Sequence, residues 1–248
     1  MKFDKLLIFN ALRISILNTI YSILLMIDYV KKILESPDAP RQIEALQKAM
    51  QDEKRRRHDF REWITPDIKA EFINGEVVLH SPVKRRHWKV TDFLSSILSI
   101  YTRVKKLGTV GTEKVMIALT RNDYEPNLVF FLKEKADTFT DEQLLFPAPD
   151  FIVEILSKGT AGKDKGIKKT DYAAHGVSEY WIIDPIQQQI TQYILFLPTD
   201  KQYSPPKVFK LNDDIESRVI KGFIMPVRAI FEDEANIETL QSLLQNKD

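Results

Sequence analysis

The 248-residue sequence contains no cysteine. This absence excludes a disulfide framework, a cysteine-ligated zinc finger and catalysis by a thiol. It fits a cytoplasmic protein, and we expect the chain to be cytoplasmic. A strong net charge is also lacking, since 36 Lys and Arg against 35 Asp and Glu give +1 at pH 7. Any contact with nucleic acid must therefore come from a local basic surface.

A hydrophobic run of membrane-spanning length is missing as well. The N-terminal segment "LLIFNALRISILNTIYSILLMIDYV" is apolar, but Arg13 interrupts it. The uncharged stretch 14–27 is shorter than the roughly 20 residues that a bilayer requires. Apolar residues recur at helical spacing, at Leu17, Ile20, Leu24 and Ile27. We expect a helix that packs on another helix or on a second subunit, which leaves a homodimer open, and we expect no stable membrane insertion.

The chain is predicted to have two regions. Residues 1–59 form an N-terminal helical extension, and residues 60–248 form a folded domain. The segment 42–63 is typical of a charged helix and carries the run "KRRRH" at 54–58. A solvated helix face explains this run better than contact with phosphates does.

From Glu71 onward short strands alternate with two helices. Asn74 and Gly75 are a turn signal inside a hairpin, and "PDFIVEIL" and "EYWIID" are apolar strands expected to be buried. The order of helix, several strands, helix and two further strands predicts an α/β domain. We expect a central mixed β-sheet flanked by helices.

One strand contains a carboxylate that needs an explanation. Glu154 lies inside the apolar run "FIVEIL", and burying an unpaired carboxylate is costly. A salt bridge or a helix cap is the structural explanation, and a ligand for a hard divalent cation is the functional one. Lysines at 163, 165, 168 and 169 follow closely. Carboxylates that hold a metal ion, together with a nearby cation, are what phosphodiester hydrolysis requires.

Several motifs occur in an order that resembles a known family. They are "AEFINGEVVLHSP", "KRRHW", "YEPNLVFF" and "PDFIVEILSKGT…DKGIKK…Y…HGVSEYWIIDP". Together they resemble the Uma-two family of bacterial endonucleases, whose fold is similar to that of the PD-(D/E)XK restriction-endonuclease-like superfamily. The resemblance covers about residues 60–197. It implies a restriction-endonuclease-like core and an endonuclease that hydrolyses DNA phosphodiester bonds with Mg²⁺ or Mn²⁺.

The resemblance also implies roles for individual residues. Glu154 matches the carboxylate of the E-x-K element, and Lys168 matches the lysine, because Leu156 stands at the usual lysine position. Glu71 matches an accessory acid that binds a metal-bound water or positions the first helix. Asp164 either orients Lys168 or caps its helix.

Four further residues are candidates for contact with nucleic acid. His87 contacts phosphate or assists proton transfer, with an ordinary surface histidine as the equal alternative. Lys163, Lys165 and Lys169 line a DNA-facing surface or are simply solvated.

The sequence departs from the family pattern at Asn127, where the pattern places the aspartate that is the principal metal ligand. The expected ligand set is therefore Glu154, Asn127 and Glu71, with only weak ligation by the amide oxygen. Neither Glu125 nor Asp150 is an evident substitute for the lost carboxylate. Two functions remain open: a Mg²⁺-dependent endonuclease weakened at Asn127, or an inactive nuclease-fold module that binds nucleic acid or a protein partner. A membrane-tethered form of either is the least favoured alternative.

Overall fold

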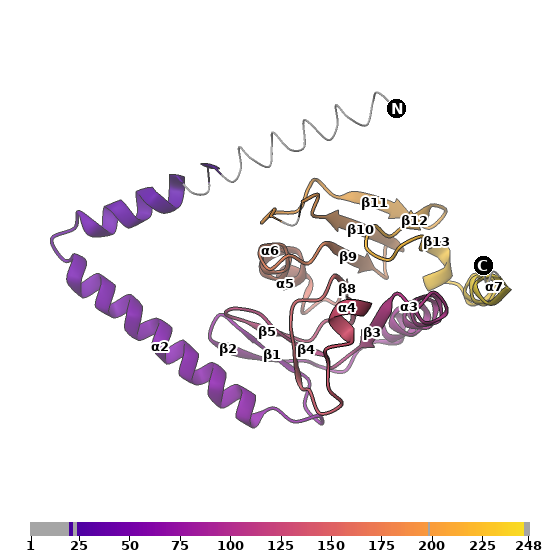
Figure 1. Ribbon diagram of the computed structural model, residues 1–248, viewed down its shortest axis with the longest axis horizontal. Coiled ribbons are helices and arrows are strands. Elements are labelled where there is room, and N and C mark those ends of the chain that lie inside the picture. The colour runs from indigo at the N-terminus through magenta and orange to yellow at the C-terminus, as the bar shows by residue number, and fades with distance from the viewer. Residues whose placement is uncertain (1–19, 22–23, 198, 246–248) are drawn as a thin grey trace. The chain divides into compact units, whose positions relative to one another are not determined.

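The computed structural model describes residues 20–21, 24–197 and 199–245, and Leu17 of the predicted apolar helix lies outside them (Figure 1). The chain divides into two units. The first comprises residues 1–68 and 72–78, and the second comprises residues 69–71 and 79–248. The domain boundary expected between residues 59 and 60 stays a prediction. Within the described ranges, none of the helices has both the length and the apolar character needed to cross a membrane.

The described part of the first unit contains two helical segments and the tip of a hairpin. Residues 24–34 are helical, and α2 spans Ala39–Trp63. The strands β1 (Ala70–Ile73) and β2 (Glu76–Leu79) form the hairpin, which the division between the units crosses. Asn74 and Gly75 both have positive φ, 51° and 86°, which confirms the predicted turn. Arg56 of the basic run donates from Nε to the Gly75 carbonyl at 3.0 Å, so this arginine has a structural role.

The second unit is a mixed α/β structure. Its helices are α3 (Arg85–Val104), α4 (Lys133–Ala136), α5 (Ala161–Lys163), η1 (Asp164–Lys168), α6 (Lys169–Ala174), η2 (Val227–Ile230) and α7 (Asp233–Gln245). Its strands are β3 (Gly108–Thr112), β4 (Met116–Ala118), β5 (Asp123–Tyr124), β6 (Leu128–Leu132), β7 (Leu145–Phe146), β8 (Phe151–Ile155), β9 (Glu179–Asp184), β10 (Gln189–Ile194), β11 (Lys207–Lys210), β12 (Asp214–Glu216) and β13 (Ile224–Pro226).

A six-stranded mixed sheet forms the centre of this unit, with the order β11-β10-β9-β8-β6-β3. The pair β8 and β9 is parallel, and every other neighbouring pair in this sheet is antiparallel. In a smaller sheet β4 pairs antiparallel with β5 and parallel with β7. The predicted mixed sheet flanked by helices is thus confirmed.

The two faces of the central sheet are covered by different helices (Figure 1). On one face Val153 and Trp181 belong to the hydrophobic core, together with Leu94 of α3. Side chains alternate between faces along a strand, so Glu154 of β8 and Tyr180 of β9 point to the other face. There the ring of Tyr180 packs edge-on against Tyr172 of α6, with centroids 5.3 Å apart. This alternation directs the carboxylate of Glu154 toward the helical segment that contains Lys168.

Candidate active site

Lys168 is carried by a helical segment with an irregular turn. The segment runs from α5 through the π-helical turn η1 into α6. A π-helical turn is uncommon and is often found at functional sites. Asp164 lies inside this segment and is buried, and the segment already begins at Ala161. The interpretation of Asp164 as a helix cap is therefore wrong.

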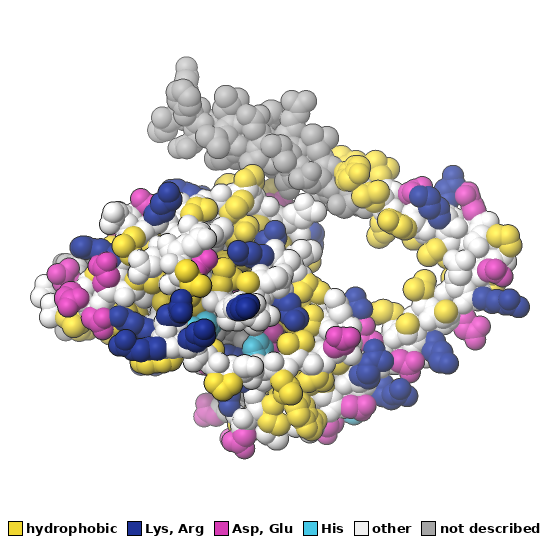
Figure 2. Space-filling model, turned by 180° about the vertical axis from the view of Figure 1, so that it is seen from behind, with side chains coloured by type: hydrophobic (Ala, Val, Ile, Leu, Met, Phe, Trp, Pro, Cys, Tyr) yellow, Lys and Arg dark blue, Asp and Glu magenta, His cyan; other side chains and the backbone are white. Residues whose placement is uncertain are grey.

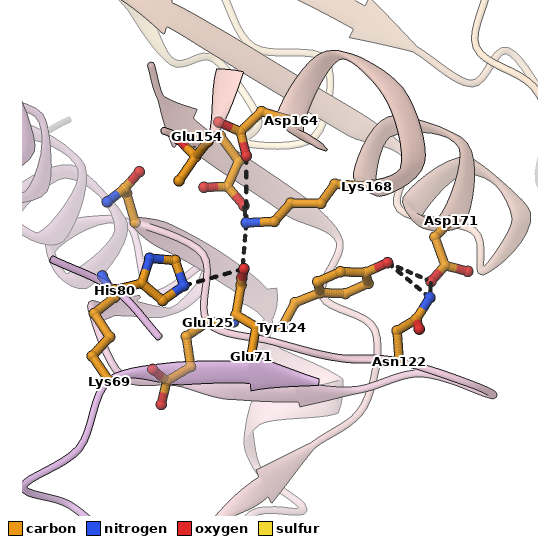
Figure 3. A network of polar contacts seen from close by, with 12 residues as sticks. Lys69, Glu71, His80, Asn122, Tyr124, Glu125, Glu154, Asp164, Lys168 and Asp171 are labelled. Atoms are coloured by element: carbon orange, nitrogen blue, oxygen red, sulfur yellow. Dashed lines mark hydrogen bonds and ion pairs between the residues drawn. The ribbon is translucent and has the colours of Figure 1, made fainter. Parts of the chain in front are cut away.

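Three carboxylates surround the ammonium group of Lys168, as Figure 3 shows. Nζ lies 2.8 Å from Glu71 Oε1, 3.0 Å from Glu154 Oε1 and 3.4 Å from Asp164 Oδ1. The Lys168 side chain is only 1% exposed. Glu154 and Lys168 form a direct ion pair, which is the salt bridge that the sequence left open as the structural explanation of the buried acid, and Glu71 and Asp164 join it.

Neighbouring groups hold these carboxylates in place. Tyr172 donates its hydroxyl to Glu154 Oε1 at 3.0 Å, so this oxygen accepts from both Tyr172 and Lys168. The backbone N–H of Glu125 donates to Glu71 Oε1 at 3.0 Å, and His80 Nε2 lies 3.2 Å from Glu71 Oε2. The cluster is thus tied to β8, β1 and α6 at once.

The acids of this cluster have pKa values that are shifted in different directions. Burial would raise the pKa of Glu71, but Lys168 and His80 outweigh burial and lower that pKa to about 2. Burial raises the pKa of Glu154 to about 8, because Lys168 offsets only part of the desolvation and two nearby acids add repulsion. Burial likewise raises the pKa of Asp164. Glu71 is therefore the anionic partner of Lys168, and Glu154 is the acid that accepts a proton most readily at neutral pH.

Asn127 lies beside the C-terminal end of β8, and both the oxygen and the nitrogen of its side-chain amide form hydrogen bonds. Its Oδ1 accepts the backbone N–H of Ile155 at 2.8 Å, and its Nδ2 donates to Glu113 Oε1 at 3.0 Å. The backbone N–H of Glu113 also donates to the Asn127 carbonyl at 3.1 Å. Glu113 in turn forms an ion pair with Lys69. Both Glu113 and Lys114 have positive φ, 51° and 47°, so this turn is held in a conformation that non-glycine residues rarely adopt.

His87 is buried at the start of α3, with 6% of its surface exposed, so the alternative of a surface histidine is wrong. Its Nε2 lies 3.0 Å from the carbonyl oxygen of Ile155. Burial lowers the pKa of His87, which favours the neutral ring. Its role in binding nucleic acid stays a prediction.

The remaining predicted residues lie outside the carboxylate cluster. Lys165 is exposed, Lys163 and Lys169 are half-buried, and Lys169 lies over the ring of Tyr193. Asp150 forms an ion pair with Lys135 at 2.8 Å and does not join the cluster.

Sequence reasoning missed three residues of this region. Tyr172 stands four residues after Lys168, which is same-face helical spacing, and this signal was available. His80 and Glu113 gave no comparable signal. His80 reaches Glu71 because a hairpin folds back, and Glu113 reaches Asn127 because of an unusual turn.

The side chains present do not fit a divalent ion held by Glu154, Asn127 and Glu71. The centre of the carboxylate cluster is taken by the Lys168 ammonium group, and the Asn127 oxygen is engaged by a backbone N–H. Among the residues that the structure describes, no three His, Asp or Glu side chains are grouped so that they could hold a metal ion.

Comparison with known proteins agrees with this architecture. The second unit is a mixed α/β structure with the fold of restriction-endonuclease-like nucleases. The crystal structure of "a putative nuclease belonging to DUF820" from Anabaena variabilis superposes with a TM-score of 0.60 at 16% identity, over 73% of this chain and 96% of that one.

The family follows from the sequence comparisons. Residues 57–228 match the family model "Uma2: Putative restriction endonuclease", and the chain belongs to this family. An uncharacterized protein of Synechocystis sp., sll1609, is 27% identical over 156 residues, which is 62% of this chain and 86% of that protein. The family resemblance in the sequence motifs is thus confirmed.

Proposed function

We propose that this chain binds DNA through its nuclease fold and that its hydrolysis of phosphodiester bonds is strongly reduced. The observation that carries the proposal is the engagement of Asn127. The family pattern places a metal-binding aspartate here, whereas this chain has an amide whose oxygen and nitrogen are both hydrogen-bonded. In this proposal the chain still binds DNA, but it hydrolyses phosphodiester bonds only weakly.

The surroundings of Asn127 favour an amide over an aspartate. An aspartate would place a carboxylate oxygen about where Nδ2 lies, 3.0 Å from the carboxylate of Glu113. Two unit charges 4 Å apart repel by about 4 kcal/mol at an effective dielectric of about 20. The amide avoids this repulsion and adds a hydrogen bond. We therefore infer that Asn127 is part of a matched pair with Glu113, so that restoring the acid requires changes at both positions.

Binding to DNA is supported by cations on the second unit. Lys84, Arg85 and Arg86 at the start of α3 are exposed, and Lys165 is exposed on η1. Figure 2 shows Lys and Arg side chains on one face of the molecule. Contact with phosphates by such side chains is independent of sequence and weakens as salt is added.

A second candidate is the Mg²⁺-dependent endonuclease in which Glu154, Glu71 and Asn127 hold the ion. It is favoured by one observation, the convergence of Glu71, Glu154 and Lys168 on one point. In this candidate Lys168 stabilises the attacked phosphate or orients water, Asp164 orients Lys168, and the two acids are the catalytic carboxylates.

The two candidates are separated by measuring binding and cleavage on the same preparations. Binding of duplex DNA is measured at several salt concentrations, and nicking of supercoiled plasmid is measured with Mg²⁺ or Mn²⁺. We expect salt-dependent binding by the unaltered chain and little or no nicking. Efficient metal-dependent nicking that Glu154→Ala abolishes would establish the endonuclease and contradict our proposal. Absence of salt-dependent DNA binding would contradict both candidates.

The Asn127 and Glu113 pair gives a sharper comparison. We expect Asn127→Asp alone to be destabilised by about 1–3 kcal/mol, because the new carboxylate faces Glu113 without a donor between them. Asn127→Asp combined with Glu113→Gln should recover most of that loss, since the glutamine amide can donate to the new aspartate. Glu113→Gln alone is the matched control. Urea unfolding of the four proteins measures the coupling, and additive effects would show that the two positions are independent.

A further inference from the structure

The helical residues 24–34 of the first unit present many large apolar side chains to solvent (Figure 2). Seven of them are between 41% and 67% exposed: Leu24, Leu25, Met26, Ile27, Tyr29, Val30 and Leu34. Isolated exposed apolar residues are ordinary, but a continuous group on one short helix indicates a contact surface.

The polar residues of this segment are confined to one stripe. Lys32 pairs with Asp28 at 2.7 Å, and Lys31 pairs with Glu35 at 3.6 Å, each across one helical turn. At 3.6 residues per turn these four residues share one side of the helix with Leu24, and the other six apolar residues occupy the rest of its circumference. The helix therefore has a broad apolar face and a narrow stripe in which two cations balance two anions.

The N-terminal half of α2 has a similar unpaired stripe. Ile43, Leu46 and Met50 are 37%, 54% and 56% exposed, and their spacing of three and four residues is that of a helix-pairing seam. Farther along the helix the pattern changes, because Phe60 is buried and packs on Phe72 of the hairpin, with ring centroids 5.7 Å apart. The first unit thus supplies a partner for the C-terminal half of α2, whereas the side chains of Ile43, Leu46 and Met50 stay exposed.

We propose that these two stripes form the contact surface of a homodimer, with a second copy of this chain as the occupant. The nine of these apolar residues that lie outside the polar stripe, all but Leu24, form the apolar face. Each is about half exposed, so together they offer on the order of 700 Å² if a whole side chain contributes roughly 150 Å². That area exceeds the 300–600 Å² of the largest patch on a typical monomer and approaches the about 800 Å² per partner of a stable interface.

The charge pattern favours a protein partner over a lipid surface. Helices that lie on membranes carry an excess of Lys and Arg on their polar side, which binds anionic headgroups. Here Lys31 and Lys32 are each paired with an acid of the same helix. A neutral polar stripe beside a broad apolar face suits association with an identical helix, because a two-fold interface brings the same patch together from both copies.

The test is the molar mass of the full chain in solution. We expect sedimentation equilibrium to give twice the monomer mass of 28.8 kDa. The double variant Val30→Glu with Leu46→Glu places one charge in each stripe and should raise the dissociation constant of the dimer by more than about 100-fold. The matched control, Lys32→Glu with Lys48→Glu, adds the same two glutamates at polar positions of the same helices and should remain dimeric.

Each other outcome overturns the proposal. A monomer at all concentrations excludes the dimer, and sedimentation of that monomer with anionic lipid vesicles would assign the surface to a membrane. A dimer that persists in the Val30→Glu and Leu46→Glu variant places the interface elsewhere. Loss of the dimer on deletion of residues 1–19, with residues 20–248 intact, assigns the contact to that segment. Circular dichroism of every variant checks that helix content is unchanged. Plasmid nicking and DNA binding are measured in separate assays, so their outcome does not affect the test of the dimer.

Discussion

Two neighbouring strands of the central sheet each bury a glutamate, and they neutralise it in different ways. Glu154 on β8 shares one ammonium group with two other carboxylates and accepts one hydroxyl. Glu179 on β9 is 0% exposed, and the five groups that donate hydrogen bonds to its carboxylate are all neutral. Its donors are Trp181 Nε1, Gln192 Nε2, Ser217 Oγ and the backbone N–H groups of Arg218 and Val219, at 2.6–3.0 Å.

The difference separates a structural acid from a candidate functional one. Five neutral donors satisfy both oxygens of Glu179 and tie residues 217–219 to the sheet, although burial still raises the pKa of this carboxyl group. At Glu154 charge is opposed by charge in a crowded group, and the pKa values of Glu71 and Glu154 are pushed in opposite directions. Acids with divergent pKa values are typical of sites that move protons or bind ions.

The largest expected effect comes from removing the shared cation. Lys168→Met would leave Glu71, Glu154 and Asp164 buried with no ammonium group between them. Breaking a buried ion pair on one side typically costs about 3–5 kcal/mol. We therefore expect the free energy of unfolding, measured by urea denaturation at neutral pH, to fall by that amount.

Lys165→Met is the matched control, since Lys165 lies on the same turn but is exposed. It should change stability by less than about 0.5 kcal/mol. Equal effects of the two changes would show that the three carboxylates are not held by Lys168.

Next in size is the pH dependence that Glu154 creates. Its pKa rises from 4.5 to about 8 on folding, so between these values the folded state binds a proton that the unfolded state has released. Stability from this group is then present below about pH 4.5 and is lost as pH rises toward 8, by at most roughly 1.4 kcal/mol per pH unit. Glu154→Gln cannot titrate, so relative to the unaltered chain it should gain stability between about pH 5 and about pH 8.

Urea unfolding of both proteins across that range measures the difference. A difference that is constant with pH would contradict the raised pKa of Glu154. The lowered pKa of Glu71 acts in another range, since its contribution is lost as pH falls from 4.5 toward 2. The two acids are therefore distinguishable by the pH at which each acts.

A smaller effect is expected at the other acid. Glu179→Gln replaces one carboxylate oxygen by an amide that donates, so at least two of the five donors would face another donor. Leaving buried groups unpaired costs about 1–3 kcal/mol. Burial raises the pKa of Glu179 above 4.5, so the unaltered chain loses stability as pH rises from 4.5 toward that pKa, and the cost of Glu179→Gln should be largest near pH 4.5 and smaller at higher pH. Glu216→Gln, at an exposed position of β12, is the control, and thermal unfolding of both variants measures the contrast.

Much of the fold and part of the candidate site could be predicted from residue patterns. The mixed sheet followed from strand alternation and from family motifs whose order is preserved, and the sequence also left open a salt bridge for Glu154 without fixing its partner. The fates of Asn127 and His87 did not follow, because both depend on backbone groups of Ile155 that come from a distant strand end. A sequence pattern gives the types of the side chains, but it does not show which backbone groups will lie within hydrogen-bonding distance of them.

The environment of Glu179 could not be predicted from the sequence either. Glu154 and Glu179 are both acids in apolar strands, and nothing in the letters "FIVEIL" and "EYWIID" tells them apart. What distinguishes them is the loop at 217–219, about 40 residues farther along, whose N–H groups reach only one of the two. The distinction belongs to tertiary structure.

The smallest expected effect concerns Tyr172, whose hydroxyl is the neutral donor in the charged cluster. Tyr172→Phe keeps the ring contacts with Tyr124 and Tyr180 and removes only the hydrogen bond to Glu154 Oε1. A single hydrogen bond contributes about 0.5–1.5 kcal/mol, and Lys168 still donates to the same oxygen, so the loss should lie in the lower half of that range. If Tyr172 stabilises the ionised form of Glu154, the variant should also move the pH-dependent fall in stability to higher pH. A shift of this fall in stability to lower pH, measured by urea unfolding, would mean that Tyr172 destabilises the ionised form of Glu154. The hydrogen bond from Tyr172 would then not act on Glu154 as the neutral donors act on Glu179.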